Sequence, residues 1–180
     1  GEDAAAIDLG EQTLVVSTDP ISLAADGIGT LGVHVACNDV AASGATPAWL
    51  TSAMFLPDDD PALLDDVTGQ LDAAARELGV ALVGGHSEYA PDREFPLLVL
   101  TCLGLADPHV PTGGARPGDA VILTKGAGIE GTAILATDFR ELLGDVDEAV
   151  VERAAGFFDR LSVVADAEAL RAYATAMHDP

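Results

Sequence analysis

The spacing of apolar residues along the first 106 positions predicts four strands and two helices. Apolar runs bounded by Pro, Gly and Asp are typical of strands. The four runs are Thr13–Thr18, Pro47–Leu56, Val80–Val83 and Pro96–Ala106. Residues 30–43 and 61–78 instead carry apolar side chains at helical intervals, and Gly44 and Gly79 stand where these helices would end. Strands and helices together predict an α/β fold.

The second part of the chain begins after a segment rich in Pro and Gly. Residues 107–118 form the clearest linker, which separates a domain over 1–106 from a second domain over 119–180. In the second domain, Asp119–Thr124 is predicted to be a strand, and a glycine-rich turn leads from it into a helix. The Ala- and acid-rich residues 145–177 are predicted to be helical.

Polar side chains near the first strand and the first helix suggest a magnesium site. Asp19 follows the first apolar run, and the adjacent pair Asn38-Asp39 lies in a helix of small residues. Mg²⁺ prefers oxygen ligands, usually one or two carboxylates together with water and substrate phosphates. The sequence therefore predicts a site for Mg²⁺ and a nucleotide. Asp19, which precedes Pro20, is also typical of a turn.

Two glycine-containing segments are candidates for contact with phosphate. Gly84, Gly85 and His86 follow the predicted strand at 80–83, where backbone N–H groups can approach a phosphate, although a plain turn uses the same residues. Lys125 and Gly126 would offer a cation and free N–H groups at the start of a helix. Lys125 precedes the glycines, so this segment lacks the spacing of a P-loop.

The chain is strongly acidic, with 30 Asp and Glu against 8 Lys and Arg and a formal net charge of −22. Nucleic-acid binding needs clustered cations, so this composition excludes a general nucleic-acid surface. Acidic residues spread along the whole chain indicate adaptation to high salt, as in a halophilic protein. An acidic protein from a mesophile is the alternative.

The remaining composition predicts a cytoplasmic protein without a membrane partner. The longest apolar stretch, Phe95–Ala106, is too short to span a bilayer, and no signal peptide is visible. Cys37 and Cys102 have neither CxxC nor metal-ligand spacing. They are expected to be small buried residues in a reducing compartment.

Four segments together resemble one protein family in their order and approximate spacing. They are GEDAA at 1–5, STDP at 17–20, NDVAASGATP at 38–47 and VGGHSE at 83–88. With these segments the chain resembles the aminoimidazole ribonucleotide (AIR) synthase superfamily, whose fold is called PurM-like. The segment KGAGIEGTAIL at 125–135 is most similar to the HypE-like and AIR synthase-related branch.

The resemblance implies an N-terminal PurM-like α/β domain whose strands pair with a second protomer, so that a homodimer shares one β-barrel. ATP and Mg²⁺ would bind at that dimer interface, and a C-terminal PurM-like α/β domain would cover the substrate. Relatives continue past a segment like that at 176–180, so the C-terminal domain is expected to be incomplete. The chain is accordingly expected to be a fragment cut at both ends.

The resemblance also implies which residues bind the cofactors. The matching positions are Asp3, Asp19 and Asp39 for the metal, and Asn38, Gly84 and Gly85 for the nucleotide. Some relatives have an acidic residue after the glycine pair, where this chain has His86. One metal ligand is therefore expected to be missing there or to be replaced by Glu88.

The activity implied by the resemblance is ATP- and Mg²⁺-dependent. Members transfer a phosphoryl group to an amide or carbonyl oxygen of a small-molecule or protein-bound substrate, as cyclo-ligases and the HypE-like dehydratases of hydrogenase maturation do. In such chemistry the protein mainly positions groups and neutralises charge. Two alternatives stay open, a non-catalytic nucleotide-binding assembly subunit and a phosphotransferase like thiamine-monophosphate kinase. The sequence singles out no nucleophile, so the catalytic residue is unknown.

We expect the melting temperature of the full-length protein to rise markedly between about 0.1 M and about 2 M KCl, because the Debye length falls from about 10 Å to below about 3 Å and screens the repulsion between carboxylates. The rise should be steepest at low salt. Thermal melts across a KCl series measure this dependence. A flat melting temperature would contradict adaptation to high salt and would leave the predicted nucleotide site unaffected.

Overall fold

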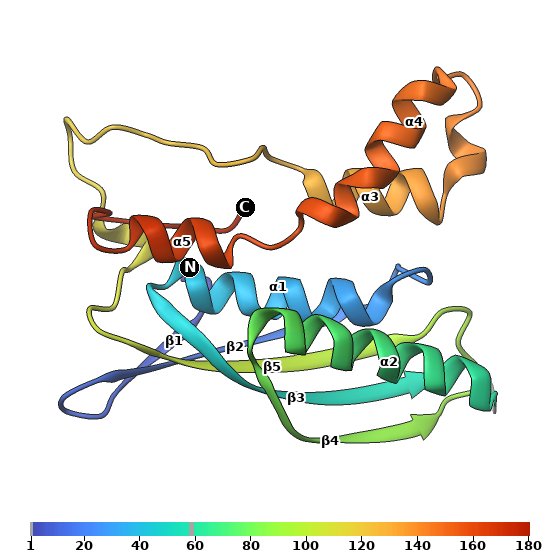
Figure 1. Ribbon diagram of the computed structural model, residues 1–180, viewed down its shortest axis with the longest axis horizontal. Helices are drawn as coiled ribbons and strands as arrows, with labels where there is room; N and C mark the ends of the chain where they lie inside the picture. The colour runs from blue at the N-terminus through green and yellow to red at the C-terminus, as the bar shows by residue number, and fades with distance from the viewer. Residues whose placement is uncertain (1, 58–59) are drawn as a thin grey trace.

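A five-stranded sheet carries two long helices on one face, and the C-terminal part of the chain packs over the first of them (Figure 1). The computed structural model describes residues 2–57 and 60–180. The strands are β1 (Ala5–Asp8), β2 (Thr13–Ile21), β3 (Ala45–Leu56), β4 (Ala81–Tyr89) and β5 (Leu97–Ala106). The α-helices are α1 (Ile28–Ala42), α2 (Pro61–Leu78), α3 (Ile129–Thr137), α4 (Glu148–Ala155) and α5 (Val164–Leu170). Short 3₁₀ turns are η1 (Thr112–Gly114), η2 (Arg140–Leu143) and η3 (Gly156–Arg160).

The strands follow the order β1-β2-β5-β3-β4 across the sheet. Neighbouring strands are antiparallel except β3 and β4, which are parallel. Parallel neighbours need a crossover connection, and helix α2 provides it. This α/β arrangement confirms the fold class predicted from the sequence.

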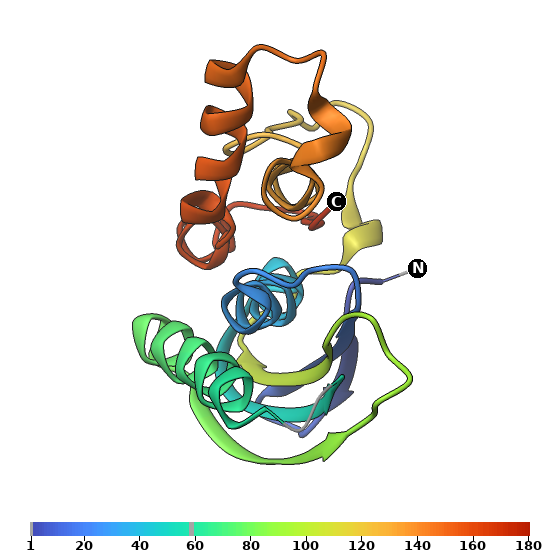
Figure 2. The same cartoon turned by 90° about the vertical axis from the view of Figure 1, so that its right-hand side faces the viewer.

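Helix α1 lies between the sheet and residues 119–180, which we call the C-terminal segment, and it is buried on both sides (Figure 2). It begins at Ile28, two residues before the predicted start, and ends at Ala42. Gly44 adopts a φ of +81°, which explains why the helix stops where the sequence predicts. Close packing against the sheet depends on Gly32, where a Cβ would lie 2.6 Å from Leu100 Cδ1.

Helix α2 follows its sequence signals at both ends. The Asp60 carboxylate accepts a hydrogen bond from the backbone N–H of Ala62 at 2.9 Å, and Pro61 is the first helical residue. At the other end Gly79 adopts the left-handed conformation with a φ of +70°. The predicted helix at 61–78 is therefore confirmed.

Strand β2 is longer than predicted, and the expected turn at Asp19-Pro20 is wrong. The strand continues to Ile21, and Pro20 pairs with Val99 of β5. On the other side, β1 pairs with β2 only from Thr13 to Val16. Beyond that point no described strand pairs with this edge of β2, so a proline without an N–H group interrupts no ladder there. Asp19 is therefore part of the strand, which fixes the direction of its side chain.

Strand β4 also continues through the glycines that were expected to form a turn. It runs to Tyr89, with a register shift beside Leu50 of β3. A Cβ at Gly85 would lie 2.1 Å from the backbone oxygen of Ser52, so the close approach of β3 requires a glycine there. β4 is an edge strand of the described sheet, and its nine residues are all exposed.

The C-terminal half differs from its prediction in two places. Residues 119–124 form no strand and Val121 is fully exposed, because no strand in the described part of the chain pairs with them. The predicted helix over 145–177 is divided into α4, η3 and α5. The expected glycine-rich turn before α3 is present, with Gly128 in the left-handed conformation.

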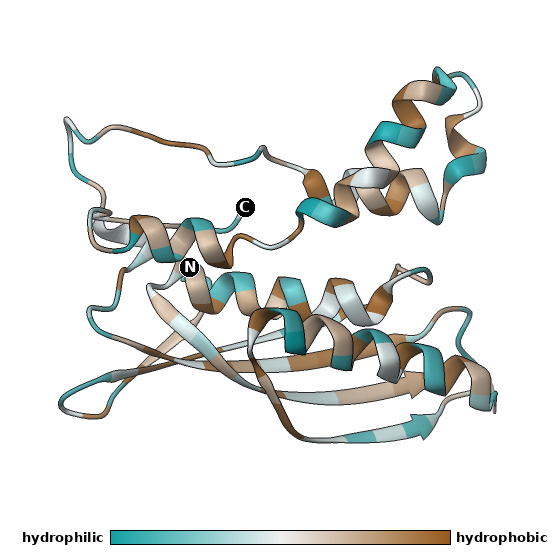
Figure 3. Ribbon diagram, viewed as in Figure 1, coloured by the Kyte–Doolittle hydropathy of each residue, from teal (hydrophilic) through white to brown (hydrophobic). Residues whose placement is uncertain are grey.

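The sheet face opposite α1 and α2 is open in the described chain (Figure 2). Along β5 the residues facing the helices are buried, and the alternate residues are half-buried. The colouring by hydropathy shows apolar residues along β5 and the first half of β4 (Figure 3). Trp49 on the open face is 39% exposed. None of the described helices is long and apolar enough to cross a bilayer.

Candidate functional site

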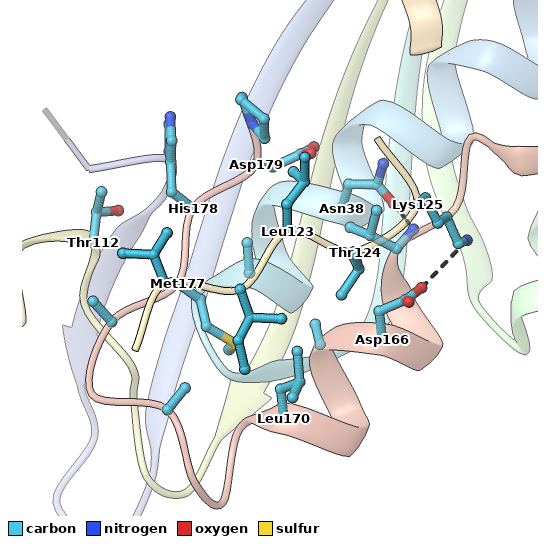
Figure 4. Close-up of a pocket in the computed structure, with 18 of the residues that line it drawn as sticks. Asn38, Thr112, Leu123, Thr124, Lys125, Asp166, Leu170, Met177, His178 and Asp179 are labelled. Carbon is cyan, nitrogen blue, oxygen red and sulfur yellow. Dashed lines mark hydrogen bonds and ion pairs between the residues drawn. The ribbon is translucent and has the colours of Figure 1, made fainter. Parts of the chain in front are cut away.

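A cavity of about 610 Å³ lies between α1 and the C-terminal segment. Its walls come from α1, residues 119–130, α5 and residues 173–180. The side chains of Asn38, Lys125, Asp166 and Asp179 surround it (Figure 4). Small-molecule sites in proteins usually measure about 300–1,000 Å³, so this cavity is the candidate binding site.

Close to this cavity, three of the predicted metal ligands meet around one hydroxyl group. Ser17 Oγ lies 2.8 Å from Asp39 Oδ2, 3.1 Å from Asp19 Oδ2 and 3.3 Å from the backbone oxygen of Asp3. Ser17 and Asp19 are alternate residues of β2, so both point toward the layer that contains α1. Asp39 comes from α1 itself. The structure thus brings the carboxylates of Asp19 and Asp39 to one hydroxyl group, whereas Asp3 approaches it through its backbone oxygen.

Burial raises the pKa of the Asp39 carboxyl to about 7, the hydrogen bond from Ser17 opposes this rise, and the charges of Asp19, Asp179 and Asp3 add to it. Because this pKa is higher in the folded protein than in the unfolded chain, Asp39 stabilises the fold at acidic pH. That contribution is lost as the pH rises through about 7. Ionised Asp39 therefore lies in a place that favours a nearby cation.

Residues from the C-terminal segment also lie near these carboxylates. Asp3 Oδ1 lies 2.6 Å from His178 Nδ1, and Asp3 Oδ2 accepts a hydrogen bond from the backbone N–H of Asp179 at 3.3 Å. Burial raises the pKa of Asp179, with Asp3 adding to the rise. Burial likewise raises the pKa of Glu130, where Asp179 and Asp19 contribute. The cavity therefore has a strongly negative side.

Asn38 connects α1 to the C-terminal segment. Its Nδ2 donates to the backbone oxygen of Leu161 at 2.9 Å, and its Oδ1 accepts from the backbone N–H of Val163 at 2.8 Å. A hydrogen bond between Asn38 and Asp179 also lowers the pKa of that carboxyl against the effect of burial. Both ends of the Asn38 amide are thus engaged within the protein. Contact between Asn38 and a nucleotide stays a prediction.

Lys125 and Gly126 also line the cavity. Lys125 Nζ lies 3.3 Å from Asp166 Oδ2 and also contacts the backbone oxygen of Ser162. Lys125 adopts a positive φ of 52°, which turns the chain before α3. Its ammonium group is held beside the cavity by a carboxylate and a carbonyl oxygen. An anion could therefore meet a positioned cation on this side.

Gly84, Gly85 and His86 lie elsewhere in the chain. They belong to β4, which is separated from β2 by β5 and β3. Three strand spacings amount to about 14 Å. His86 Nε2 lies 3.2 Å from Glu88 Oε2 on this exposed edge strand. One copy of the chain thus does not bring His86 to the carboxylates around Ser17.

Within residues 2–57 and 60–180, no three acidic, histidine or cysteine side chains form a ready cation site. Mg²⁺ does not need such a site, because it is commonly held by one or two carboxylates together with water and phosphate oxygens. Asp19 and Asp39, with the Ser17 hydroxyl between them, have the oxygen chemistry that Mg²⁺ prefers. These residues therefore fit the metal.

Sequence reasoning did not identify every residue of this site. It assigned Ser17 no role at the site and considered the segment at 176–180 only for the extent of the chain. Ser17 precedes Asp19 by two positions in a strand, so the shared direction of the two side chains could have been noticed. Glu130 and Asp166 carry no comparable sequence signal, because only the tertiary structure brings them to the cavity.

Comparison with known sequences identifies related proteins. The sequence profile described as "AIR synthase related protein, N-terminal domain" matches residues 1–106. Carbamoyl dehydratase HypE of Rhizobium leguminosarum bv. viciae is 30% identical over 76% of this chain and 42% of its own length. Thiamine-monophosphate kinase of Halobacterium salinarum is 34% identical over 99% of this chain and 59% of its own length. The chain spans about half the length of these curated relatives.

Solved structures show the same fold. A crystal structure of hydrogenase maturation protein HypE is 32% identical with a TM-score of 0.71, over 93% of this chain and 52% of that chain. Thiamine monophosphate kinase from Aquifex aeolicus, at 19% identity, has a TM-score of 0.75 over 97% of this chain and 60% of that chain. The second comparison concerns the fold alone. Both agree with the mixed α/β architecture predicted from the sequence.

Replacing Asn38 with Ala should loosen the attachment of the C-terminal segment to α1. The substitution leaves the backbone groups of Leu161 and Val163 without partners, at about 1–3 kcal/mol for each buried group. We expect faster hydrogen exchange across residues 161–170 and a lower melting temperature.

Gln70→Ala is the matched control for this prediction. The Gln70 Oε1 accepts a hydrogen bond from the backbone N–H of Gly29 at 2.9 Å, so this amide connects α2 to α1 instead. The control should leave exchange at 161–170 unchanged. Equal exchange in the two variants would show that Asn38 does not hold the segment.

Proposed function

The chain belongs to the family of AIR synthase related proteins, and on this premise we propose that it binds ATP with Mg²⁺ and transfers a phosphoryl group to an amide or carbonyl oxygen. The proposal concerns the whole protein, because the relatives are about twice as long as this chain. A solved structure described as hydrogenase maturation protein HypE in complex with ATP is 36% identical over 66% of this chain, with a TM-score of 0.56. That likeness supports ATP as the nucleotide.

The observation that carries this proposal is the meeting of Asp19 and Asp39 around the Ser17 hydroxyl. Two carboxylates close together repel one another, and burial adds to the cost of ionising Asp39. A divalent cation offsets both effects when it binds. Bound there, Mg²⁺ would supply the positive charge that neutralises phosphate oxygens in phosphoryl transfer.

The other residues around the cavity would position the substrates. Lys125, held by Asp166, offers a cation at the wall of the cavity. Arg160 lines the same cavity. In so acidic a chain these two side chains and the metal counteract the repulsion of ATP. Asn38 would act indirectly, by holding residues 161–163 in place.

A homodimer would resolve the separation of His86 from the carboxylates around Ser17. The open face of the sheet presents half-buried apolar residues, and β4 is the last strand of the described sheet. A twofold arrangement covers such a face with the same face of a second copy. It would also allow β4 of one copy to approach the carboxylates of the other. We therefore propose a shared barrel with nucleotide sites between the copies.

The second candidate function is phosphorylation of a small phosphorylated substrate. The thiamine-monophosphate kinase of Halobacterium salinarum is 34% identical to this chain and matches 99% of its residues. Full-length protein incubated with ATP and thiamine monophosphate would form thiamine diphosphate in this case. ATP turnover that thiamine monophosphate does not stimulate favours the amide or carbonyl substrate instead.

ATP should bind more tightly with Mg²⁺ than with EDTA, by about tenfold or more, which corresponds to about 1.4 kcal/mol. Calorimetric titration of the full-length protein in high salt measures both affinities. Asp39→Asn should abolish the difference, because it removes one negative charge and keeps the shape of the side chain.

Asp72→Asn is the control for the loss of charge, since Asp72 pairs with Arg76 on the exposed side of α2. This variant should keep the full effect of Mg²⁺. Equal ATP affinity of the unmodified protein in Mg²⁺ and in EDTA would refute the proposed metal-nucleotide site. Global unfolding of Asp39→Asn would instead assign Asp39 a structural role.

Sedimentation of the full-length protein in molar salt should give the mass of a dimer. Trp49→Glu should yield monomers, because it places a charge on the open face of the sheet. Tyr173→Glu, at an 85% exposed residue of the C-terminal segment, should leave the dimer intact. A protein that sediments only as a monomer would contradict the shared barrel.

A further inference from the structure

Ser17 occupies a central position among the carboxylates. It lies in β2 with its side chain toward α1, and the residue is only 6% exposed. Its partner in the adjacent strand is Cys102, whose side chain is fully buried. The hydroxyl group is therefore shielded from solvent, with oxygen atoms of Asp3, Asp19 and Asp39 as its polar neighbours. This placement gives the Ser17 hydroxyl a fixed direction.

One hydroxyl group serves three acceptors in this place. The Ser17 Oγ lies within 3.3 Å of Asp39 Oδ2, Asp19 Oδ2 and the backbone oxygen of Asp3. A serine hydroxyl carries one proton, so it can donate to one of these oxygens at a time. The shortest distance, 2.8 Å, is to Asp39. Ser17 thus connects the β2 carboxylate and the α1 carboxylate through a single atom.

No simple packing requirement explains a polar side chain here. The neighbouring inward residue of β2, Val15, is apolar and fully buried. A buried hydroxyl is costly unless it is hydrogen-bonded, and the acceptors that Ser17 finds are the oxygens of the proposed metal site. Residues that orient the ligands of a metal commonly change its affinity by about 10- to 100-fold.

We propose that Ser17 is a positioning residue, which holds the Asp19 and Asp39 carboxylates at the separation and orientation that receive a divalent cation. The inference rests on the proposed Mg²⁺-dependent function and adds a residue that does not itself need to contact the nucleotide. The Ser17 hydroxyl donates its single proton to one carboxylate at a time, at the shortest distance to Asp39 Oδ2, while its oxygen stays beside Asp19 Oδ2. Without it, the Asp39 carboxylate loses the hydrogen bond that holds it beside Asp19.

The test compares Ser17→Thr with Ser17→Val in the full-length protein. The two substitutions have nearly the same shape and differ in whether a hydroxyl group is present. Mn²⁺ alone is titrated into metal-free protein in high salt, and free Mn²⁺ is counted by electron paramagnetic resonance. We expect Ser17→Thr to bind Mn²⁺ as the unmodified protein does. Ser17→Val should bind it about tenfold or more weakly.

Ser43→Ala is the control for removal of a buried hydroxyl that contacts the backbone of Asp39. Ser43 is 5% exposed, and its Oγ donates to the backbone oxygen of Asp39 at 3.1 Å instead of to a carboxylate. This variant should keep its Mn²⁺ affinity. A thermal melt in EDTA accompanies each variant, so that loss of fold is distinguished from loss of metal binding.

The outcomes separate this inference from the function on which it rests. If the unmodified protein binds no Mn²⁺, the proposed metal site is wrong. If it binds Mn²⁺ and Ser17→Val binds equally well, the role of Ser17 is refuted and the metal site stands. A loss of affinity in Ser43→Ala as large as in Ser17→Val, or no retention in Ser17→Thr, would also overturn the inference. Should the residue-17 variants fail to melt cooperatively, Ser17 serves the fold and the inference is rejected.

Discussion

The burial of α1 on two sides is the constraint on which the rest of the structure depends. The helix packs on the sheet through small residues such as Gly32, and the C-terminal segment is attached to its other side through Asn38. Asp39, the next residue, is thereby carried toward β2. One helix thus sets the distance between the sheet, the cavity and the carboxylates around Ser17.

The same packing places carboxyl groups where burial makes their ionisation unfavourable. Asp39 and Asp179 are half-buried, burial raises the pKa of each carboxyl, and the charge of Asp179 raises the pKa of Asp39 further. A protein that used these residues only for its fold would be more stable with neutral side chains in their places. Their presence is understandable if a cation is part of the working protein. The overall acidity of the chain makes such local neutralisation more important still.

Local signals in the sequence were sufficient for elements whose bounds depend on residues close together in the sequence. The cap at Asp60, the stop at Gly79 and the periodicity between them predicted α2, and the motifs around Asp19 and Asp39 predicted that these carboxylates belong to one site. The extension of β2 through Pro20 depends on how far β1 reaches, and the extension of β4 depends on its pairing with β3. Such dependence on a neighbouring strand is not visible in a short window of sequence. The contact of Ser17 with Asp39 likewise joins positions 22 residues apart.

The contacts of Asp3 with His178 and Asp179 bear on how the protein is made in the cell. These residues are 175 and 176 positions apart in the sequence. During translation Asp3 leaves the ribosome long before His178 and Asp179 are synthesised. Its contacts with them can therefore form only after nearly the whole of this sequence has been made. Closing so long a loop is entropically costly and is favoured only once the intervening sheet has formed. The negatively charged side of the cavity therefore assembles late, and a nascent chain can complete its sheet before it can bind a ligand.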